Sequence, residues 1–262
     1  MDISLKNKNA IVCGSTHGIG KASALELAKQ GANVTLIARN ENLLKNTQAE
    51  LFNDGGQTHD YIAVDFNYPL KLRDEINKFS KNHPVTHILV NNTGGPKPGN
   101  ILLADINEFT SAFSAHLICN HILVQALVPG MKEEKYGRII NIISTSVKQP
   151  IKGLGVSNTI RWAVASWAKT LSVELAPSGI TVNNILPGAT KTERLYSLFE
   201  TNAKGAGVSI DVIQKEWLKD IPAGRFGEPE ELANVIAFLA SPAASYINGI
   251  NLPVDGGRLN SL

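Results

Sequence analysis

Three glycines near the start of the chain have the spacing of a phosphate-binding turn. Residues 10–20 read A-I-V-C-G-S-T-H-G-I-G, so an apolar run ends at Gly14, and Gly18 and Gly20 precede a helix-like segment. A strand that turns through glycines into a helix presents free backbone N–H groups and the positive end of a helix dipole. Glycine also lets the backbone approach a phosphate closely. The spacing G-x-x-x-G-x-G differs from the commoner G-x-G-x-x-G, and it predicts a site for nucleotide phosphates.

A basic residue follows the second predicted strand. This strand ends I-A-R-N, with Arg39 at the edge that also carries the glycine turn. In a parallel nucleotide-binding sheet this strand end faces the adenosine ribose, where a carboxylate suits a 2′-hydroxyl and an arginine suits a 2′-phosphate. His17, inside the turn, could supply a second donor. The pattern favours NADP(H) over NAD(H), whereas the alternative is that Arg39 is an ordinary solvated surface arginine.

Asparagine and glycine follow a third apolar run. Residues 91–99 read N-N-T-G-G-P-K-P-G directly after a predicted strand. These residue types supply side-chain hydrogen bonds and unusual backbone angles. The segment is either only a tight turn or one wall of the nucleotide site, and its place beside the glycine turn favours the wall.

These residues must be positioned by alternating strands and helices. Near-continuous apolar strands separated by helical periods predict an α/β fold, a parallel sheet of about seven strands flanked by helices on both faces. Ligand then binds at the carboxyl ends of the strands, where Gly14, Arg39, Asp65 and Asn92 fall. Strands are predicted at 9–14, 33–38, 59–64, 87–91, 138–144, 181–186 and 250–254, and helices at 18–30, 41–53, 69–81, 109–135, 156–176 and 229–240.

Composition limits the class of protein. The chain has 262 residues, 43% of them hydrophobic and 18% charged, which suits one large α/β domain. The net charge is only +2 and no basic run occurs, so we expect neither nucleic acid nor a membrane surface as partner. Cys13 and Cys119 fall in apolar stretches and read as buried small hydrophobes. Without a signal-like start or an apolar run of ~18 residues, a cytoplasmic location is expected.

The motifs together resemble the short-chain dehydrogenase/reductase family. The matching pieces are C-G-S-T-H-G-I-G (13–20), N-N-T-G (91–94), G-R-I-I-N-I-I-S (137–144), N-N-I-L-P-G (183–188) and a tail, from I-P-A-G-R-F-G-E-P-E-E-L-A to N-L-P-V-D-G-G, that is similar to 3-oxoacyl-(acyl carrier protein) reductases. The resemblance covers nearly the whole chain. It implies one Rossmann-like domain over residues 1–262, doubly wound, with a nicotinamide cofactor. It also implies hydride transfer to or from a small carbonyl or hydroxyl compound, and a homo-oligomer, either tetramer or dimer.

Carried over position by position, the resemblance implies a cofactor site. The pyrophosphate would lie against the glycine turn and the adenine beside Asp65. The ribose would lie along Asn92 and Gly94, and the nicotinamide against the P-G-A-T-K-T segment. The residues implied are Gly14, Ser15, Thr16, His17, Gly18, Ile19, Gly20, Arg39, Asp65, Asn92, Gly94, Pro187, Gly188 and Thr192.

The catalytic positions depart from the family pattern, which is Asn-Ser-Tyr-Lys. Ser144 matches the serine, but Ser157 and Arg161 stand at the tyrosine and lysine positions, and His116 falls at the asparagine position. A serine hydroxyl is a far weaker acid than a phenol, whose pKa of ~10 a nearby cation can lower. Arg161 keeps the positive charge toward the ribose but cannot transfer a proton, because its pKa exceeds ~12. His116, with an ordinary pKa of ~6.5, is the best remaining donor, unless it is a hydrogen-bonded core histidine.

Residues 190–222 form a substrate lid by the same resemblance. Tyr196, Phe199 and Trp217 either clamp an apolar substrate or pack the lid onto the body, and Tyr196 is a possible surrogate donor. The sequence is compatible with three functions. The first is an NADP(H)-dependent carbonyl reductase with an altered catalytic tetrad. The second is a silent nucleotide-binding sensor or subunit of a mixed oligomer. The third is chemistry without net redox change.

Overall fold

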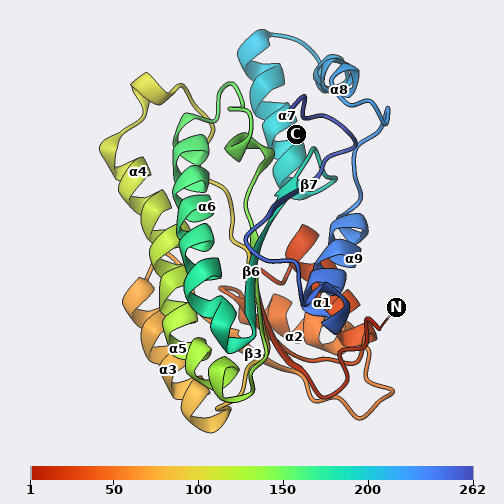
Figure 1. Cartoon of the computed structure of the whole chain (residues 1–262). Helices are drawn as coiled ribbons and strands as arrows, with labels where there is room; N and C mark the ends of the chain where they lie inside the picture. The colour runs from red at the N-terminus through yellow and green to blue at the C-terminus, as the bar shows by residue number, and fades with distance from the viewer. Residues whose placement is uncertain (1, 262) are drawn as a thin grey trace.

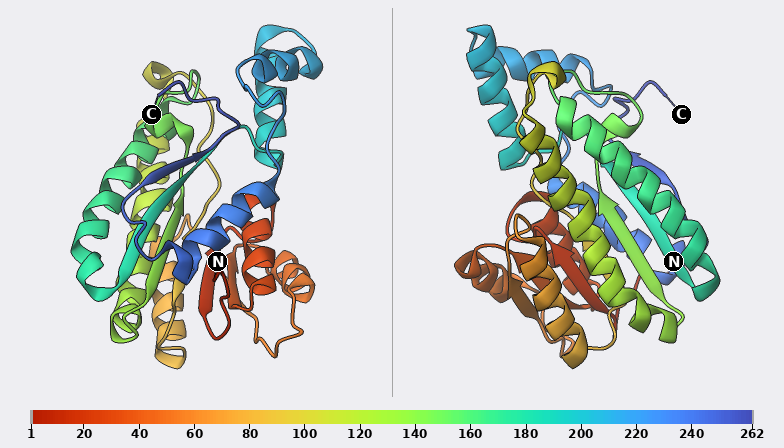
Figure 2. Two further views of the ribbon diagram at one scale, coloured as in Figure 1. Left: turned by 45° about the vertical axis from the view of Figure 1, so that its right-hand side comes forward. Right: turned by 90° about the vertical axis from the view of Figure 1, so that its left-hand side faces the viewer.

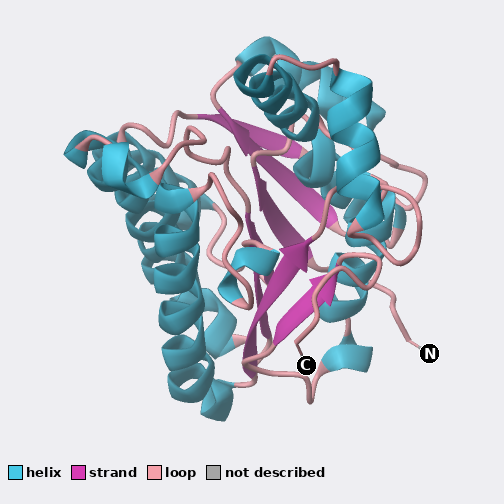
Figure 3. Cartoon of the chain, turned by 90° about the horizontal axis from the view of Figure 1, so that it is seen from above, coloured by secondary structure: helices cyan, strands magenta, loops and turns pink. Residues whose placement is uncertain are grey.

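Seven short apolar segments pair in parallel into one sheet in the computed structural model, which describes residues 2–261 (Figures 1 and 3). This is the Rossmann-like sheet that the alternating pattern predicts. The strands are β1 (Asn9–Cys13), β2 (Asn33–Ala38), β3 (Asp60–Ala63), β4 (Ile88–Asn91), β5 (Gly137–Ile142), β6 (Ile180–Pro187) and β7 (Asn251–Val254). Their order across the sheet is β3-β2-β1-β4-β5-β6-β7.

The strand order reverses between β1 and β4, which opens a crevice at the carboxyl edge. The chain first runs outward from β1 to β3, then returns to place β4 on the other side of β1. Connections on the two sides of this point leave in opposite directions, so their loops separate and a ligand can enter. Gly14 follows β1 and Asn92 follows β4, so both lie at this crevice.

Helices cover both faces of the sheet (Figures 1 and 2). One face carries α1, α2 and α9, around a core that includes Leu27, Leu36 and Ile236. The other carries α3, α5 and α6, around a core that includes Leu72 and Leu123. The bounds are α1 (Gly18–Lys29), α2 (Glu41–Glu50), α3 (Pro69–Asn82), α4 (Ile106–Phe113), α5 (Cys119–Glu133), α6 (Gly155–Leu175), α7 (Glu193–Ala206), α8 (Ile210–Lys219) and α9 (Pro229–Ala240).

The helix expected at 109–135 begins earlier and is not uniform. It starts at Ile106, and α4 passes into α5 through a π-helical turn at Ser114–Ile118. Such turns insert an extra residue and often mark functional sites. By length and composition alone, Ile106–Glu133 is apolar enough to cross a membrane. Its fully buried Leu123 and Met131, however, pack in the core against the sheet, as in a core helix.

Four asparagines form a hydrogen-bonded ladder across β4, β5, β6 and β7. Asn91 Nδ2 donates to Asn141 Oδ1 at 2.9 Å, Asn141 Nδ2 to Asn184 Oδ1 at 2.9 Å, and Asn184 Nδ2 to Asn251 Oδ1 at 2.8 Å. These residues are direct partners in the strand register, so the ladder fixes that register. It lies one residue before Asn92 and the turn that follows it.

The segment expected to be a polar lid contains two helices that the sequence pattern did not reveal. Thr192 caps the N-terminus of α7, and Gly207, with a φ of 67°, ends it. The two helices pack around Phe199, which is fully buried against Trp217 and Phe226. They stand above the carboxyl edge of the sheet (Figures 1 and 2).

Candidate active site

Two adjoining cavities run along the carboxyl edge of the sheet. One, of about 420 Å³, lies under the lid, and the other, of about 580 Å³, lies between the ends of β1, β2 and β4. Both are lined by the glycine turn and by the segment after β4, so together they form one groove. This groove reaches from Arg39 at one end to Ser157 at the other.

The glycine turn has a backbone that larger residues would not permit. Gly14 and Gly18 have φ values of 59° and 50°. A Cβ on Gly14 would lie 2.7 Å from Asn92 Nδ2, and one on Gly20 would lie 2.1 Å from the Gly14 carbonyl oxygen. His17 precedes α1 without a side-chain cap, so the first N–H groups of the helix are left for another acceptor. The turn therefore fits a phosphate.

The outer cavity places Arg39 and Asp65 together, beside Thr16 and His17. Asp65 Oδ1 accepts from the Asn67 N–H at 2.9 Å. Ser15 behaves differently from its neighbours, since its side chain is buried and directed to the Ile37 carbonyl at 3.4 Å. Ser15 thus holds the turn against β2, and Gly20 allows its close packing, but neither residue lines the groove.

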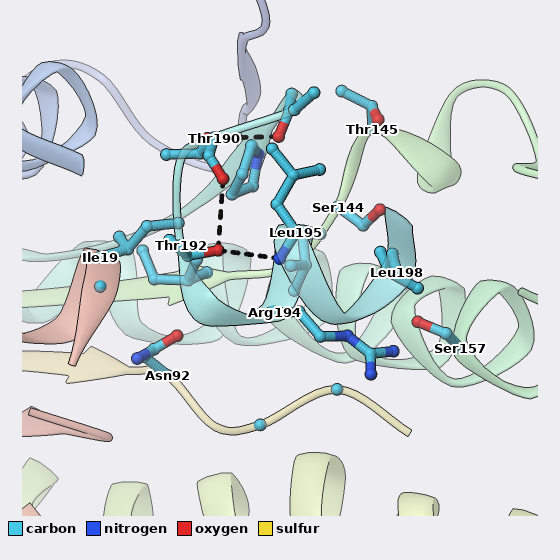
Figure 4. A pocket seen from close by; sticks show the side chains of 18 of the residues that line it. Ile19, Asn92, Ser144, Thr145, Ser157, Thr190, Thr192, Arg194, Leu195 and Leu198 are labelled. Carbon is cyan, nitrogen blue, oxygen red and sulfur yellow. Dashed lines mark hydrogen bonds between the residues drawn. The ribbon is translucent and has the colours of Figure 1, made fainter. Parts of the chain in front are cut away.

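The inner cavity brings the other expected cofactor residues together under the lid. Gly94, Pro187, Gly188 and Thr192 all line it, with Ile19. Pro187 ends β6. A Cβ on Gly188 would lie 2.5 Å from Asp255 Cα, so this position has room only for glycine. Figure 4 shows Ile19 and Asn92 on the side of the cavity away from Ser144 and Ser157.

Ser144 and Ser157 open on the same cavity from two elements. Ser144 follows β5, and its Oγ accepts from the Ser146 N–H at 3.0 Å, which leaves its own O–H free to donate. Ser157 lies in the first turn of α6 and lines the cavity wall. Two hydroxyl donors therefore face a common space, where they could polarise an oxygen atom.

Arg161 lies one turn after Ser157 and is only 8% exposed. Its Nη1 donates to the Ile142 carbonyl at 2.9 Å, and the residue lines the cavity. Burial, with a contribution from Arg194, lowers its pKa to about 10, so the guanidinium keeps its charge at neutral pH. The charge expected at the lysine position is thus present.

His116 is not on the cavity wall. It is 2% exposed and occupies the π-helical turn between α4 and α5. Burial, and then the charge of Arg161, hold its pKa well below the ordinary value, although a hydrogen bond to the Gly94 backbone opposes this. The imidazole is therefore neutral, and its role as proton donor stays a prediction that this geometry does not favour. The hydrogen bond instead lets His116 position Gly94.

The structure adds residues that sequence reasoning missed. Arg194, in the first turn of α7, lines the inner cavity and donates to the Pro96 carbonyl at 2.5 Å. Asn158 donates from Nδ2 to the Ile151 carbonyl at 2.9 Å, which ties the loop before α6 to Ser157. Arg194 follows Thr192 by two residues, but without the helix its direction could not be inferred.

The lid aromatics mainly hold the lid together. Phe199 is fully buried, and its ring centroid lies 5.3 Å from that of Trp217. Trp217 also lines the inner cavity, whereas Tyr196 is exposed and does not. The packing interpretation therefore holds for Phe199, and Tyr196 is not placed to donate a proton in the cavity.

Comparisons with known proteins identify the family. A family model described as enoyl-(acyl carrier protein) reductase matches residues 14–258. The chain is 32% identical to the 3-oxoacyl-[acyl-carrier-protein] reductase FabG of Aquifex aeolicus over 262 residues, 98% of this chain and 99% of that protein. It is 29% identical to the NADPH-dependent reductase BacG of Bacillus subtilis over 259 residues, 98% of this chain and 100% of that protein.

A solved structure gives the same result for the fold. L-sorbose reductase from Gluconobacter frateurii, complexed with NADPH and L-sorbose, superposes with a TM-score of 0.93 at 31% identity, over 100% of both chains. The family match, these relatives and the parallel sheet with its glycine turn lead to one conclusion. The chain belongs to the short-chain dehydrogenase/reductase family and is an NAD(P)-dependent oxidoreductase.

Proposed function

We propose that this protein transfers a hydride between NADP(H) and a carbonyl or hydroxyl group of a small molecule, with an altered catalytic tetrad. The observation that carries the proposal is the continuous groove, which joins a glycine turn suited to phosphate with two serine hydroxyls under a lid. BacG is named an NADPH-dependent reductase, and the sorbose reductase structure holds NADPH with a sugar substrate. Both support NADPH as the cofactor, and the second also supports a carbonyl compound as the substrate.

The residues of the groove fit the cofactor along its length. Arg39 and His17 would hold a 2′-phosphate, the glycine turn the pyrophosphate, and the Pro187–Gly188 segment the nicotinamide ring. When bound, NADPH supplies a hydride to the carbonyl carbon. Within residues 2–261, no carboxylate oxygen lies within 4.0 Å of the Arg39 guanidinium, so its charge is available to an anion. This supports the preference for NADP(H).

The chain's own groups then act on the carbonyl oxygen. The O–H groups of Ser144 and Ser157 donate hydrogen bonds to it and stabilise the negative charge that develops there. Because a serine hydroxyl is a weak acid and Arg161 does not release its proton, water supplies the proton through these hydroxyls. The oxygen gains one proton and the carbon one hydride, which gives the alcohol.

We also propose that copies of the chain assemble through the outer surface of α5 and α6. Trp162 is 51% exposed and Val173 is 68% exposed on α6, and an apolar surface of this kind suits a self-interface. Light scattering coupled to gel filtration tests this, with a dimer or tetramer expected and a monomer contradicting it.

The test of the hydride transfer is NADPH oxidation in the presence of a panel of ketones, with the product identified. Ser144→Ala should lower kcat by about 100-fold, the usual effect of removing one such donor. Ser245→Ala, at an exposed serine that lines neither cavity, is the matched control and should leave kcat unchanged.

Two outcomes would contradict the proposal. Tight NADPH binding with no product from any ketone would favour the silent nucleotide-binding protein. Product formed without loss of NADPH absorbance would favour chemistry without net redox change.

A further inference from the structure

Three arginines line the inner cavity, and one of them, Arg258, lies over the Trp217 ring, 5.0 Å from its centroid. Of the other two, Arg161 reaches the cavity from α6 and Arg194 from α7. Among the described residues, no carboxylate oxygen lies within 4.0 Å of either guanidinium. Each makes one hydrogen bond, to the backbone carbonyls of Ile142 and Pro96 respectively. Since a guanidinium has five N–H donors, most of these donors have no protein acceptor.

The free N–H groups open on the cavity and not into packed protein. In the described part of the chain, the fully enclosed side-chain polar atoms that lack a partner are Asn91 Oδ1 and Ser146 Oγ, and neither belongs to an arginine. The guanidinium donors are therefore accessible from the cavity. In Figure 4 the Arg194 side chain extends from the lid toward the Ser157 side.

The two charges also repel each other. Burial lowers the pKa of Arg161 and of Arg194, and the charge of Arg194 lowers that of Arg161 further. Glu193 is the one acidic residue among those lining the inner cavity, and it pairs with His17 at 3.4 Å. Buried like charges are retained where an anion offsets them, because otherwise neutral residues are more stable.

We propose that the substrate carries a carboxylate, which Arg161 and Arg194 hold beside the reacting carbonyl. This inference rests on the proposed function and names its substrate class. The rest of the wall is largely apolar, with Ile151, Leu154 and Leu198, so the substrate is an oxo carboxylate with a short apolar chain. The carboxylate would accept hydrogen bonds from both guanidiniums and order the lid through Arg194.

The phosphates of the cofactor are the other possible anion. The site proposed for them is the glycine turn, and Figure 4 shows Ile19 of that turn on the opposite side of the cavity from Ser157. Arg194 interacts instead with Arg161 and with the Pro96 carbonyl. The experiment must nevertheless separate an anion of the substrate from an anion of the cofactor.

The test measures binding to the NADP⁺-loaded protein, so it does not depend on turnover. Isothermal titration calorimetry compares short-chain oxo carboxylates with their neutral methyl esters. We expect the acids to bind about 10- to 100-fold more tightly than the esters, as charge-assisted hydrogen bonds predict. Arg194→Gln should remove this ratio, and Arg194→Lys should keep part of it.

Two controls complete the design. Arg73→Gln removes an exposed arginine of α3 that lines neither cavity, and it should leave the ratio unchanged. NADPH affinity should be the same in the wild type and in Arg194→Gln. Equal binding of acids and esters would overturn the inference, even if ketones are reduced. A loss of NADPH affinity in Arg194→Gln that matches the loss of acid binding would assign the arginine to the cofactor and overturn it too.

Discussion

Replacing Arg161 with methionine should make the folded protein more stable while impairing its function. Burial is the main reason that the pKa of Arg161 falls to about 10. Relative to the ordinary guanidinium, this means that the fold disfavours the charged form by about 3 kcal/mol. Methionine has similar length and no charge, so Arg161→Met removes this penalty. It also removes the hydrogen bond to the Ile142 carbonyl, which contributes about 1–2 kcal/mol.

The net gain in the free energy of unfolding is then about 1–2 kcal/mol, which raises Tm by about 2–6 °C for a chain of this length. Circular dichroism during heating, without cofactor, measures it. Arg73→Met, at an exposed site, should change Tm by less than about 1 °C. Arg161→Met should also bind oxo carboxylates more weakly. A Tm that falls by several degrees would refute the reasoning, because it would make Arg161 a structural residue and not one kept for a ligand.

Three further predictions concern the ladder, the pH dependence and the cofactor. Asn141→Ala removes two hydrogen bonds of the asparagine ladder and should lower the free energy of unfolding, measured by urea titration, by about 2–4 kcal/mol. Asn251→Ala, at the exposed end of the ladder, should have a smaller effect. Equal losses in the two variants would contradict a stabilising role of the ladder. Burial lowers the pKa of His87 to about 4, and its Nδ1 accepts a hydrogen bond from the Asn9 N–H at 3.0 Å. Below about pH 6.5 the unfolded chain therefore binds more protons than the folded one. The free energy of unfolding should fall between pH 6.5 and pH 4 by up to about 3 kcal/mol. Urea titrations across this range should show a flatter dependence for His87→Gln, and an unchanged slope would disprove the assignment. Arg39→Gln should weaken NADPH binding by about 10-fold or more in a fluorescence titration while leaving NADH binding unchanged, and a parallel loss of both would count against a 2′-phosphate contact.

The sheet was predictable from sequence because its strands are short, apolar and separated by helical periods. All seven predicted strands exist, although several end one or two residues from the expected position. Ser144, expected at the end of a strand, instead caps the 3₁₀ turn Thr145–Val147. Strand ends depend on side-chain hydrogen bonds such as this one, which periodicity does not encode.

The lid could not be predicted for a different reason. Its first helix, α7, contains Gly205 and ends at Gly207, and both helices are held by their own small core around Phe199. Such packing overrides local propensity. Arg194 was missed for the same reason, since only the helix directs it to the cavity.

His116 shows where motif and environment diverge. Its position matched the expected asparagine, and the π-helical turn around it is a feature that sequence alone did not suggest. The burial that keeps it neutral includes the packing of the π-helical turn against α6, which lies further along the chain. A residue's type can therefore be read from a motif, whereas its protonation depends on the fold.

The most direct test of the central claim uses NADPH that carries deuterium at the transferred position. The unaltered protein is incubated with this cofactor and the oxo carboxylate panel, and the products are examined by mass spectrometry. We predict deuterium on the former carbonyl carbon of a hydroxy acid, with an equal amount of NADP⁺ formed. Tight cofactor binding without deuterium in any product would contradict hydride transfer and leave the protein as a nucleotide-binding subunit.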